Sequence, residues 1–301
     1  MPAVKKLLEC VPNFSEGRDL EKIEKIVEPF RAKQGVKLLD YQRDKDHNRL
    51  VVTVVGQPGP LKEAVVDAVG AAIELIDMRT HQGQHPRMGA VDVIPFIPVK
   101  NITVAETVKF SKAVAAALAQ RYQLPIFLYE QSADRPERRN LAVIRKGQFE
   151  GMAKKIKQPQ WAPDFGPAQI HPTAGVTAMG ARMPLVAYNV NLDTDNLEIA
   201  DHIARTVRHI GGGLRYCKAI GIALQDRGIV QVSMNMTDYS QTALYRAFEL
   251  IRIEARRYGV NVVGSEVIGL VPMEALIDTA AYYLGLEQFS MDQVLEARIW
   301  E

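Results

Sequence analysis

Short apolar runs rich in β-branched residues alternate along the first half of the chain with longer segments in which apolar residues recur every three or four positions. The short runs predict strands, and the longer segments predict amphipathic helices. In residues 60–77, for example, Ala and Val recur at i, i+3 and i+4, and Pro60 suits the first turn of a helix. We therefore predict strands at 7–14, 36–41, 50–56, 91–99 and 125–129, and helices at 20–31, 60–77 and 103–122.

The second half of the chain starts a new pattern after an interruption. Residues 131–165 are rich in Arg and Lys, and the motif at 161–167 holds two prolines and one glycine, which predicts an irregular but ordered loop. From residue 184 onward we predict strands at 185–192, 219–224, 229–236 and 260–263. Helices are predicted to begin near Thr194 or Asp195, either of which is a reasonable N-cap, and to cover 241–258 and 272–284.

The order of these elements predicts the fold class. From residue 184 the order is β-α-β-β-α-β, which is typical of a ferredoxin-like sandwich, and the first half begins with a similar β-α-β-β-α run. We predict an α/β protein made of two ferredoxin-like lobes, residues 1–183 and 184–301. A cleft between two such lobes is a common place for a ligand.

Composition and charge exclude several classes of protein. The 301 residues include 37 basic and 35 acidic side chains, so the chain lacks the charge excess of a nucleic-acid binder. The two cysteines have no metal-ligand spacing and form no disulfide framework. The N-terminus carries no apolar stretch of signal-peptide length, and no apolar run approaches the ~18–20 residues needed to span a bilayer. We predict a soluble, cytoplasmic protein without nucleic-acid or membrane partners.

Residues 81–92 concentrate the candidate chemistry of the chain. Gly83, Pro86 and Gly89 favour a tight loop before an apolar strand, a position where scaffolds commonly present functional groups. Imidazole is the side chain best suited to proton transfer near neutral pH. The glycine between the two histidines, and the lack of a following glutamate, argue against a helical zinc motif, so we predict no metal. The polar members of the loop are His81, His85, Arg87 and Asp92.

Five motifs resemble the formiminotransferase family. They occur in the same order as in the family, and the match runs through nearly the whole chain. The longest is Ile76-Asp-Met-Arg-Thr-His-Gln-Gly-Gln-His-Pro-Arg-Met-Gly-Ala-Val-Asp-Val-Ile-Pro-Phe-Ile-Pro-Val99. The others are Glu9-Cys-Val-Pro-Asn-Phe-Ser-Glu-Gly17, Asn48-Arg49, Trp161-Ala-Pro-Asp-Phe-Gly-Pro167 and Val262-Val-Gly-Ser-Glu-Val-Ile-Gly-Leu-Val-Pro272.

This resemblance implies two α/β lobes with a substrate tunnel between them, a homodimer, and transfer of the formimino group of N-formimino-L-glutamate to N5 of tetrahydrofolate. It implies that His85 is the catalytic residue and that tetrahydrofolate is a co-substrate, with no further cofactor. It also implies a folate-binding stretch after the Trp-Ala-Pro-Asp-Phe motif, made of Gly166, Pro167, Ala168, Gln169, Ile170, His171, Pro172, Thr173, Ala174 and Gly175.

The chain departs from the family pattern at Gln42, where the animal enzymes have an aspartate implicated beside the catalytic histidine. Asp40, Asp44 and Asp46 are near in sequence but do not match that position. The animal domain is also fused to a cyclodeaminase. Because this chain ends too early to carry that domain, we expect a separate cyclodeaminase to process the product.

The proposed chemistry assigns roles that each have a structural alternative. His85 fits a general base and acid. Its alternative role is structural, as a hydrogen-bond partner of a loop carbonyl. Arg49 and Arg87 fit the carboxylates of the substrates, and otherwise form salt bridges to Asp40 or Asp92. Asn13 and Ser15 fit substrate contacts, and otherwise cap the helix that starts at Leu20. Trp161 and Phe165 fit core packing better than stacking on a pterin ring.

Three other functions remain open from the sequence. Formyl transfer between 5-formyltetrahydrofolate and glutamate would use the same acid–base groups. A folate-binding protein without catalysis is favoured only by Gln42, and a metal-dependent hydrolase is the weakest alternative.

Overall fold

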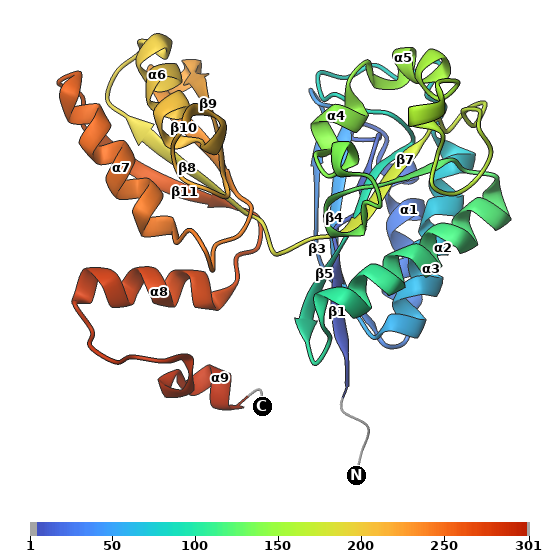
Figure 1. Ribbon diagram of the computed structural model, residues 1–301, viewed down its shortest axis with the longest axis horizontal. Coiled ribbons are helices and arrows are strands. Elements are labelled where there is room, and N and C mark those ends of the chain that lie inside the picture. The colour runs from blue at the N-terminus through green and yellow to red at the C-terminus, as the bar shows by residue number, and fades with distance from the viewer. Residues whose placement is uncertain (1–4, 300–301) are drawn as a thin grey trace. The chain divides into compact units, whose positions relative to one another are not determined.

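The computed structural model describes residues 5–299, which form two compact units that join between Arg182 and Met183 (Figure 1). This junction lies one residue before the expected boundary. Each unit has its own hydrophobic core, so each is described by itself.

Seven strands form one sheet within residues 5–182, and β1 and β2 together occupy a single position in it. Both pair with β4 on one side and with β5 on the other, while β3 pairs with the outer edge of β4. Beyond β5 the sheet continues with β7 and β6, which run parallel. The strands are β1 Leu7–Cys10, β2 Asn13–Phe14, β3 Val36–Asp44, β4 Arg49–Gly56, β5 Val91–Lys100, β6 Ile126–Leu128 and β7 Thr177–Ala181.

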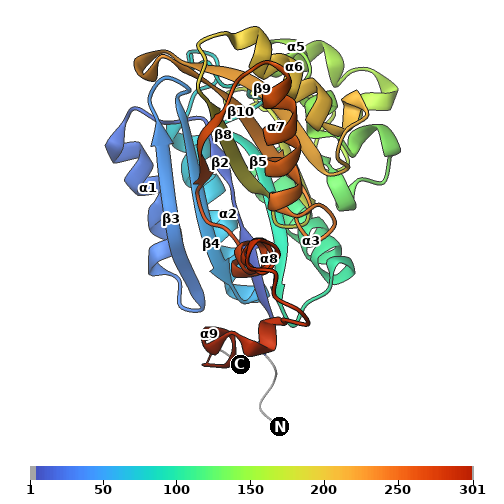
Figure 2. The same cartoon turned by 90° about the vertical axis from the view of Figure 1, so that its left-hand side faces the viewer.

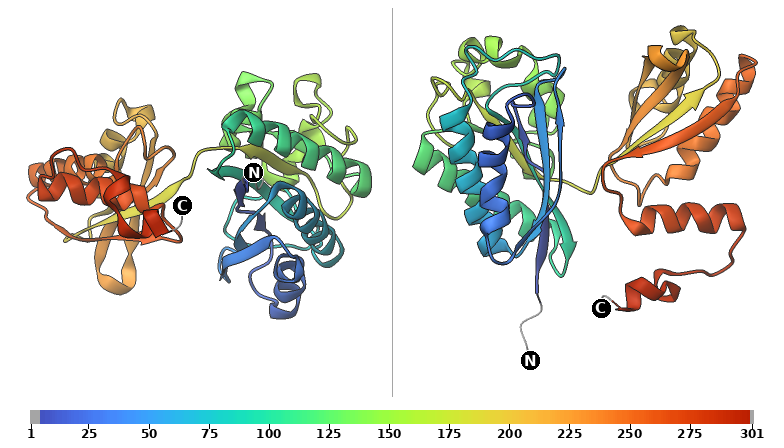
Figure 3. Two further views of the ribbon diagram at one scale, coloured as in Figure 1. Left: turned by 90° about the horizontal axis from the view of Figure 1, so that it is seen from below. Right: turned by 180° about the vertical axis from the view of Figure 1, so that it is seen from behind.

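Three long helices cover one face of this sheet (Figure 3). They are α1 Leu20–Ala32, α2 Pro58–Leu75 and α3 Val104–Tyr122. A second core of the same unit lies around Phe127, Ile144 and Met152. Residues of α4 Leu141–Arg145, α5 Gln148–Lys155 and the 3₁₀ turn Pro159–Trp161 pack in it. Two further 3₁₀ turns lie at Glu130–Ser132 and Pro136–Arg138. The predicted α/β core is therefore a ferredoxin-like sandwich extended by α3, β6 and β7.

The second unit confirms the predicted ferredoxin-like topology within residues 183–299. Its four strands lie in the order β11-β8-β10-β9, all antiparallel, and α6 and α7 pack on them (Figure 2). The elements are β8 Val186–Leu192, α6 Leu197–Val207, β9 Cys217–Leu224, β10 Ile229–Met236, α7 Leu244–Arg257 and β11 Val262–Ile268, followed by α8 Met273–Leu284 and α9 Leu295–Ile299. Short 3₁₀ turns lie at His209–Gly211, Gln225–Arg227 and Met291–Gln293.

Several of the predicted elements need correction. The strand at 7–14 is two strands, because Pro12 lacks the N–H that would continue the ladder. The helix predicted from Thr194 or Asp195 is capped by Asn196, whose side chain accepts from the amide of Glu198 at 3.0 Å. The last strand is longer and later than 260–263. Strand β7 was not predicted, since Thr-Ala-Met-Gly-Ala is short and poor in β-branched residues.

Candidate active site

Residues 76–90 connect α2 to β5 and hold the polar loop in place through the backbone. The amide of Met78 donates to the carbonyl of Thr173 at 2.8 Å, and the amide of Ala90 donates to that of Ala174 at 2.9 Å. Gly89 is required here, because a Cβ on it would lie 2.3 Å from the carbonyl oxygen of Val176. The predicted loop is thus fastened to the end of the stretch 166–175 by backbone hydrogen bonds.

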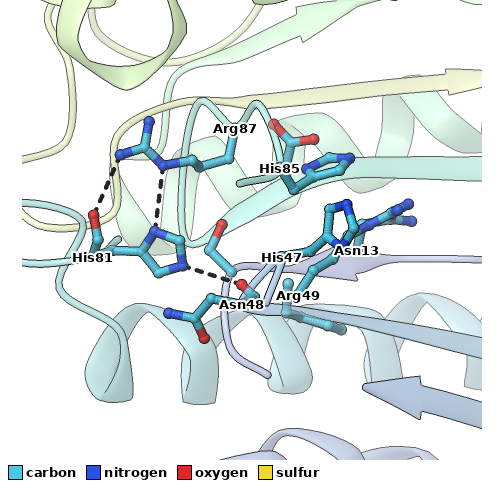
Figure 4. A pocket seen from close by; sticks show the side chains of 10 residues that line it. Asn13, His47, Asn48, Arg49, His81, His85 and Arg87 are labelled. Carbon is cyan, nitrogen blue, oxygen red and sulfur yellow. Dashed lines mark hydrogen bonds between the residues drawn. The ribbon is translucent and has the colours of Figure 1, made fainter. Parts of the chain in front are cut away.

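A small cavity of about 10 Å³ brings together side chains from four segments of the first unit (Figure 4). It has room for roughly one water molecule, so it accommodates reacting atoms and not a whole substrate. The sequence-predicted residues Asn13, Ser15, Arg49, His85 and Arg87 all line it. The full lining is Asn13, Phe14, Ser15, His47, Asn48, Arg49, His81, His85, Arg87 and Asp92.

His85 is held in its neutral form by its surroundings. Burial lowers the pKa of His85 to about 3, and the charges of Arg49 and Arg145 act in the same direction, while Asp44 opposes them. Within residues 5–299, the His85 ring makes no hydrogen bond to a loop carbonyl, so the structural alternative for this residue is not observed. A neutral imidazole facing a cavity can accept a proton.

Arg49 points into the cavity from the start of β4 and is oriented by Asn13. Its Nε donates to Asn13 Oδ1 at 3.0 Å, and Nη2 donates to the same oxygen. Burial lowers the pKa of Arg49, and the nearby charge of Asp92 opposes that effect. Its guanidinium is a partly buried cation at the cavity wall.

Neither Asn13 nor Ser15 caps the helix that starts at Leu20, which corrects that alternative. The cap is Asp19, whose carboxylate accepts from the amides of Glu21 and Lys22. Ser15 instead donates from Oγ to the carbonyl of Gly89 at 2.8 Å. It ties the end of β2 to the histidine loop.

Arg87 is paired with Glu150 and not with Asp40 or Asp92, as the sequence alternative had it. Nη1 donates to Glu150 Oε2 at 3.0 Å, and Nη2 donates to Oε1 at 2.7 Å. Asp92 pairs with Arg145, and it also accepts from the amide of Met88 at 2.9 Å. The guanidinium of Arg87 is therefore engaged by the scaffold.

His81 supports this arrangement between Arg87 and Asn48. Its Nδ1 accepts from Arg87 Nε at 3.3 Å, and its Nε2 lies 3.1 Å from the carbonyl of Asn48. The proton consequently belongs on Nε2, which donates to that carbonyl. Asn48 holds the same segments together, because its side chain accepts from Gly17 N and donates to Gln82 O, both at 2.9 Å.

Gln42 does not line the cavity. Its side chain is exposed on β3 and donates to Asp40 Oδ2 at 3.0 Å. The carboxylate that influences His85 belongs to Asp44, at the end of the same strand. Asp44 bonds His47, a cavity residue that the sequence reasoning missed although it directly precedes the Asn48-Arg49 motif.

The predicted folate-binding stretch 166–175 adjoins the cavity without lining it. Gly166 adopts a left-handed conformation, with φ of 86°, and the stretch closes in a bridge between His171 and Gly175. His171 Nδ1 accepts from the amide of Ala174 at 3.0 Å and so shapes this turn. Trp161 and Phe165, just before it, pack against the cores as predicted.

Residues 5–299 hold neither a metal-ligand cluster nor a helix suited to crossing a membrane. No group of three or more His, Cys, Asp or Glu side chains there is arranged to hold a metal ion. None of the helices in that part of the chain is long and apolar enough to cross a membrane.

The fold and the cavity define a two-unit α/β protein whose first unit holds a small cavity lined by histidine and arginine side chains. The chain belongs to the formiminotransferase family. Residues 7–182 match the N-terminal subdomain of the formiminotransferase domain, and residues 187–299 match the formiminotransferase domain.

Named relatives support the same family. The chain is 58% identical over 292 residues to the glutamate formimidoyltransferase of Streptococcus pyogenes serotype M1, which covers 97% of this chain and 98% of that protein. It is 44% identical over 295 residues to the glutamate formimidoyltransferase of Thermoplasma acidophilum, covering 97% of each. It is 43% identical over 289 residues to the formimidoyltransferase-cyclodeaminase of Rattus norvegicus, covering 94% of this chain and 53% of that protein.

Proposed function

We propose that this protein transfers the formimino group of N-formimino-L-glutamate to N5 of tetrahydrofolate, with His85 as general base and acid. The observation that carries the proposal is the 58% identity to a glutamate formimidoyltransferase over nearly the full length of both chains. The cavity supports it, because a neutral histidine and a partly buried arginine face the same small space.

The reaction requires proton transfers at two nitrogens. N5 of the folate attacks the amidine carbon to give a tetrahedral intermediate, and the bond from that carbon to glutamate's nitrogen then breaks. His85 accepts the proton that N5 loses, a contribution typically worth about 10²–10⁴-fold in rate. Holding both substrates together supplies more, because positioning contributes up to roughly 7–11 kcal/mol in favourable cases.

Arg49 is the residue that we assign to a substrate carboxylate. A planar guanidinium binds carboxylates through two parallel hydrogen bonds, and Arg49 is already oriented by Asn13. A bound carboxylate also offsets the positive charge that disfavours protonation of His85, so substrate binding prepares that histidine to accept a proton. Arg87, Asn13 and Ser15 hold this arrangement together.

The remaining parts of the substrates need more room than the cavity offers. An open depression of about 520 Å³ lies beside it and shares His81 and Arg87 as wall residues. We assign the folate to the stretch 166–175, because Thr173 and Ala174 bond directly to the histidine loop. No metal or further cofactor takes part in this mechanism.

We further propose a cytoplasmic homodimer, an assignment that rests on the family resemblance. Light scattering of the purified protein checks the oligomeric state, since a mass of about 67 kDa, twice the 33.5 kDa chain, is expected.

An activity assay tests the proposal. The purified full chain is mixed with formiminoglutamate and tetrahydrofolate, and the absorbance of 5-formiminotetrahydrofolate is followed. His85→Ala is expected to lose at least about 10²-fold in kcat, whereas the control His209→Ala, an exposed histidine outside the cavity, keeps full activity. Absence of product, or an unchanged rate for His85→Ala, contradicts the proposal. Faster turnover of 5-formyltetrahydrofolate with glutamate assigns formyl transfer instead.

A further inference from the structure

His47 lies in the turn between β3 and β4 and is fixed there by Asp44. One carboxylate oxygen of Asp44 accepts from the amides of Asp46 and His47, at 2.9 and 2.8 Å. The other lies 2.8 Å from His47 Nδ1. Because a carboxylate accepts, Nδ1 carries a proton and donates it to Asp44, which leaves Nε2 for other partners.

The His47 ring faces His85 across the small cavity (Figure 4). The two ring centroids are 6.3 Å apart, with an angle of 63° between the ring planes. Within residues 5–299 the two rings share no hydrogen bond, so each is available to an atom placed between them. The cavity of about 10 Å³ that both line has room for one such atom.

The two histidines differ in their access to water. His85 is mostly buried, whereas the His47 side chain is 47% exposed. A proton on His47 therefore exchanges readily with solvent, and a proton on His85 does so less easily. Gly83 maintains the approach of the two segments, because a Cβ there would lie 2.3 Å from the carbonyl oxygen of His47.

We propose that His47, held by Asp44, is a second proton-transfer residue of the same reaction. The inference rests on the proposed function and divides its two proton transfers between two groups. After N5 attacks the amidine carbon, His85 removes the proton from N5. As the carbon–nitrogen bond to glutamate breaks, protonated His47 gives its Nε2 proton to the departing nitrogen. Solvent then returns a proton to His47 and takes one from His85, so protons balance over a turnover.

Kinetics of His47 variants test this division. His47→Ala is expected to lower kcat about 10–10²-fold, with KM for formiminoglutamate changed less than about threefold, because Arg49 and His85 are retained. Added imidazole is expected to restore much of the kcat, since the vacated position is open to solvent. Asp44→Asn is expected to lower kcat less than His47→Ala. The control His209→Ala is expected to keep the kcat and KM of the unaltered protein, with or without added imidazole.

Rescue separates a chemical role from a structural one. A His47→Ala rate equal to that of the unaltered protein overturns the inference, and so does a loss that imidazole does not restore. A second readout is independent of turnover. Formiminoglutamate is titrated into the unaltered protein while the imidazole signals are followed by NMR, and both His47 and His85 are expected to shift. A shift of His85 alone overturns the role of His47, whereas no turnover and no binding overturn the proposed function itself.

Discussion

Arg87 and Glu150 form a bidentate ion pair that joins the histidine loop to the first turn of α5. The amide of Phe149 strengthens the junction by donating to the carbonyl of Arg87 at 2.9 Å. The hydrogen bond from Arg87 lowers the pKa of Glu150, which stays ionised near neutral pH. Arg87 therefore holds the loop in place, and Arg49 is the cation that faces the reacting groups.

Removing this pair should destabilise the protein more than removing an ordinary surface pair. Glu150→Ala leaves the nearly buried Arg87 without its main partner, and we expect a loss of about 1–3 kcal/mol in the free energy of unfolding. The matched control is Glu63→Ala, which breaks the exposed Lys33 pair and should cost less than about 1 kcal/mol. Urea denaturation measures both, and equal losses contradict this view of Arg87.

Arg49→Lys should weaken substrate binding although the charge is kept. The single ammonium group of a lysine cannot contact Asn13 and a carboxylate together, as the planar guanidinium does. We therefore expect KM for formiminoglutamate to rise about tenfold, which is equivalent to one lost hydrogen bond to a charged group. Arg121→Lys, on the exposed end of α3, is the control and should leave KM unchanged. An unchanged KM in Arg49→Lys removes this residue from the binding site.

The protein should lose stability in acid partly through His85. Its pKa is about 3 in the folded chain and about 6.5 when unfolded, so below about pH 6.5 the unfolded chain binds a proton that the folded chain refuses. The resulting loss of folding stability is absent above about pH 7 and grows as pH falls toward 3. Burial also lowers the pKa of His81, which adds an effect of the same sign.

His85→Gln tests this linkage because it removes one titrating group and keeps the others. Between pH 7 and pH 5 the free energy of unfolding should fall less steeply in His85→Gln than in the unaltered protein. Parallel curves over that range would show that His85 is not kept neutral by the fold.

Gly83→Ala should disturb the spacing of the two histidines. The new methyl group would press on the carbonyl of His47 and on the side chain of Asn48, at 2.3 and 2.8 Å. We expect a loss of about 1–3 kcal/mol in stability and a lower kcat. Gly59→Ala in the first turn of α2 is the control, because no atom lies within 4 Å of its added Cβ. A Gly83→Ala protein with normal melting temperature and kcat contradicts the packing described for this loop.

Local sequence predicted the regular elements and the chemical character of the site. Helix α3 begins as expected, because Thr103 and Glu106 form a capping box from residues three apart. The second unit follows its β-α-β-β-α-β order, since short connections allow few other topologies. Glycine and proline likewise predicted the loop at residues 81–92. Those properties depend on neighbours in the chain.

The tertiary structure alone decided the partners of the site residues. Glu150 reaches Arg87 from 63 positions away, and Arg145 reaches Asp92 from 53, because α4 and α5 pack against the histidine loop. His47 meets His85 only where the β3–β4 turn approaches Gly83. No period or motif encodes such contacts, since an ion pair or a ring contact is selected by which surfaces the folded core brings together. The sequence thus determined which functional side chains are present, and packing determined which of them lie together in one site.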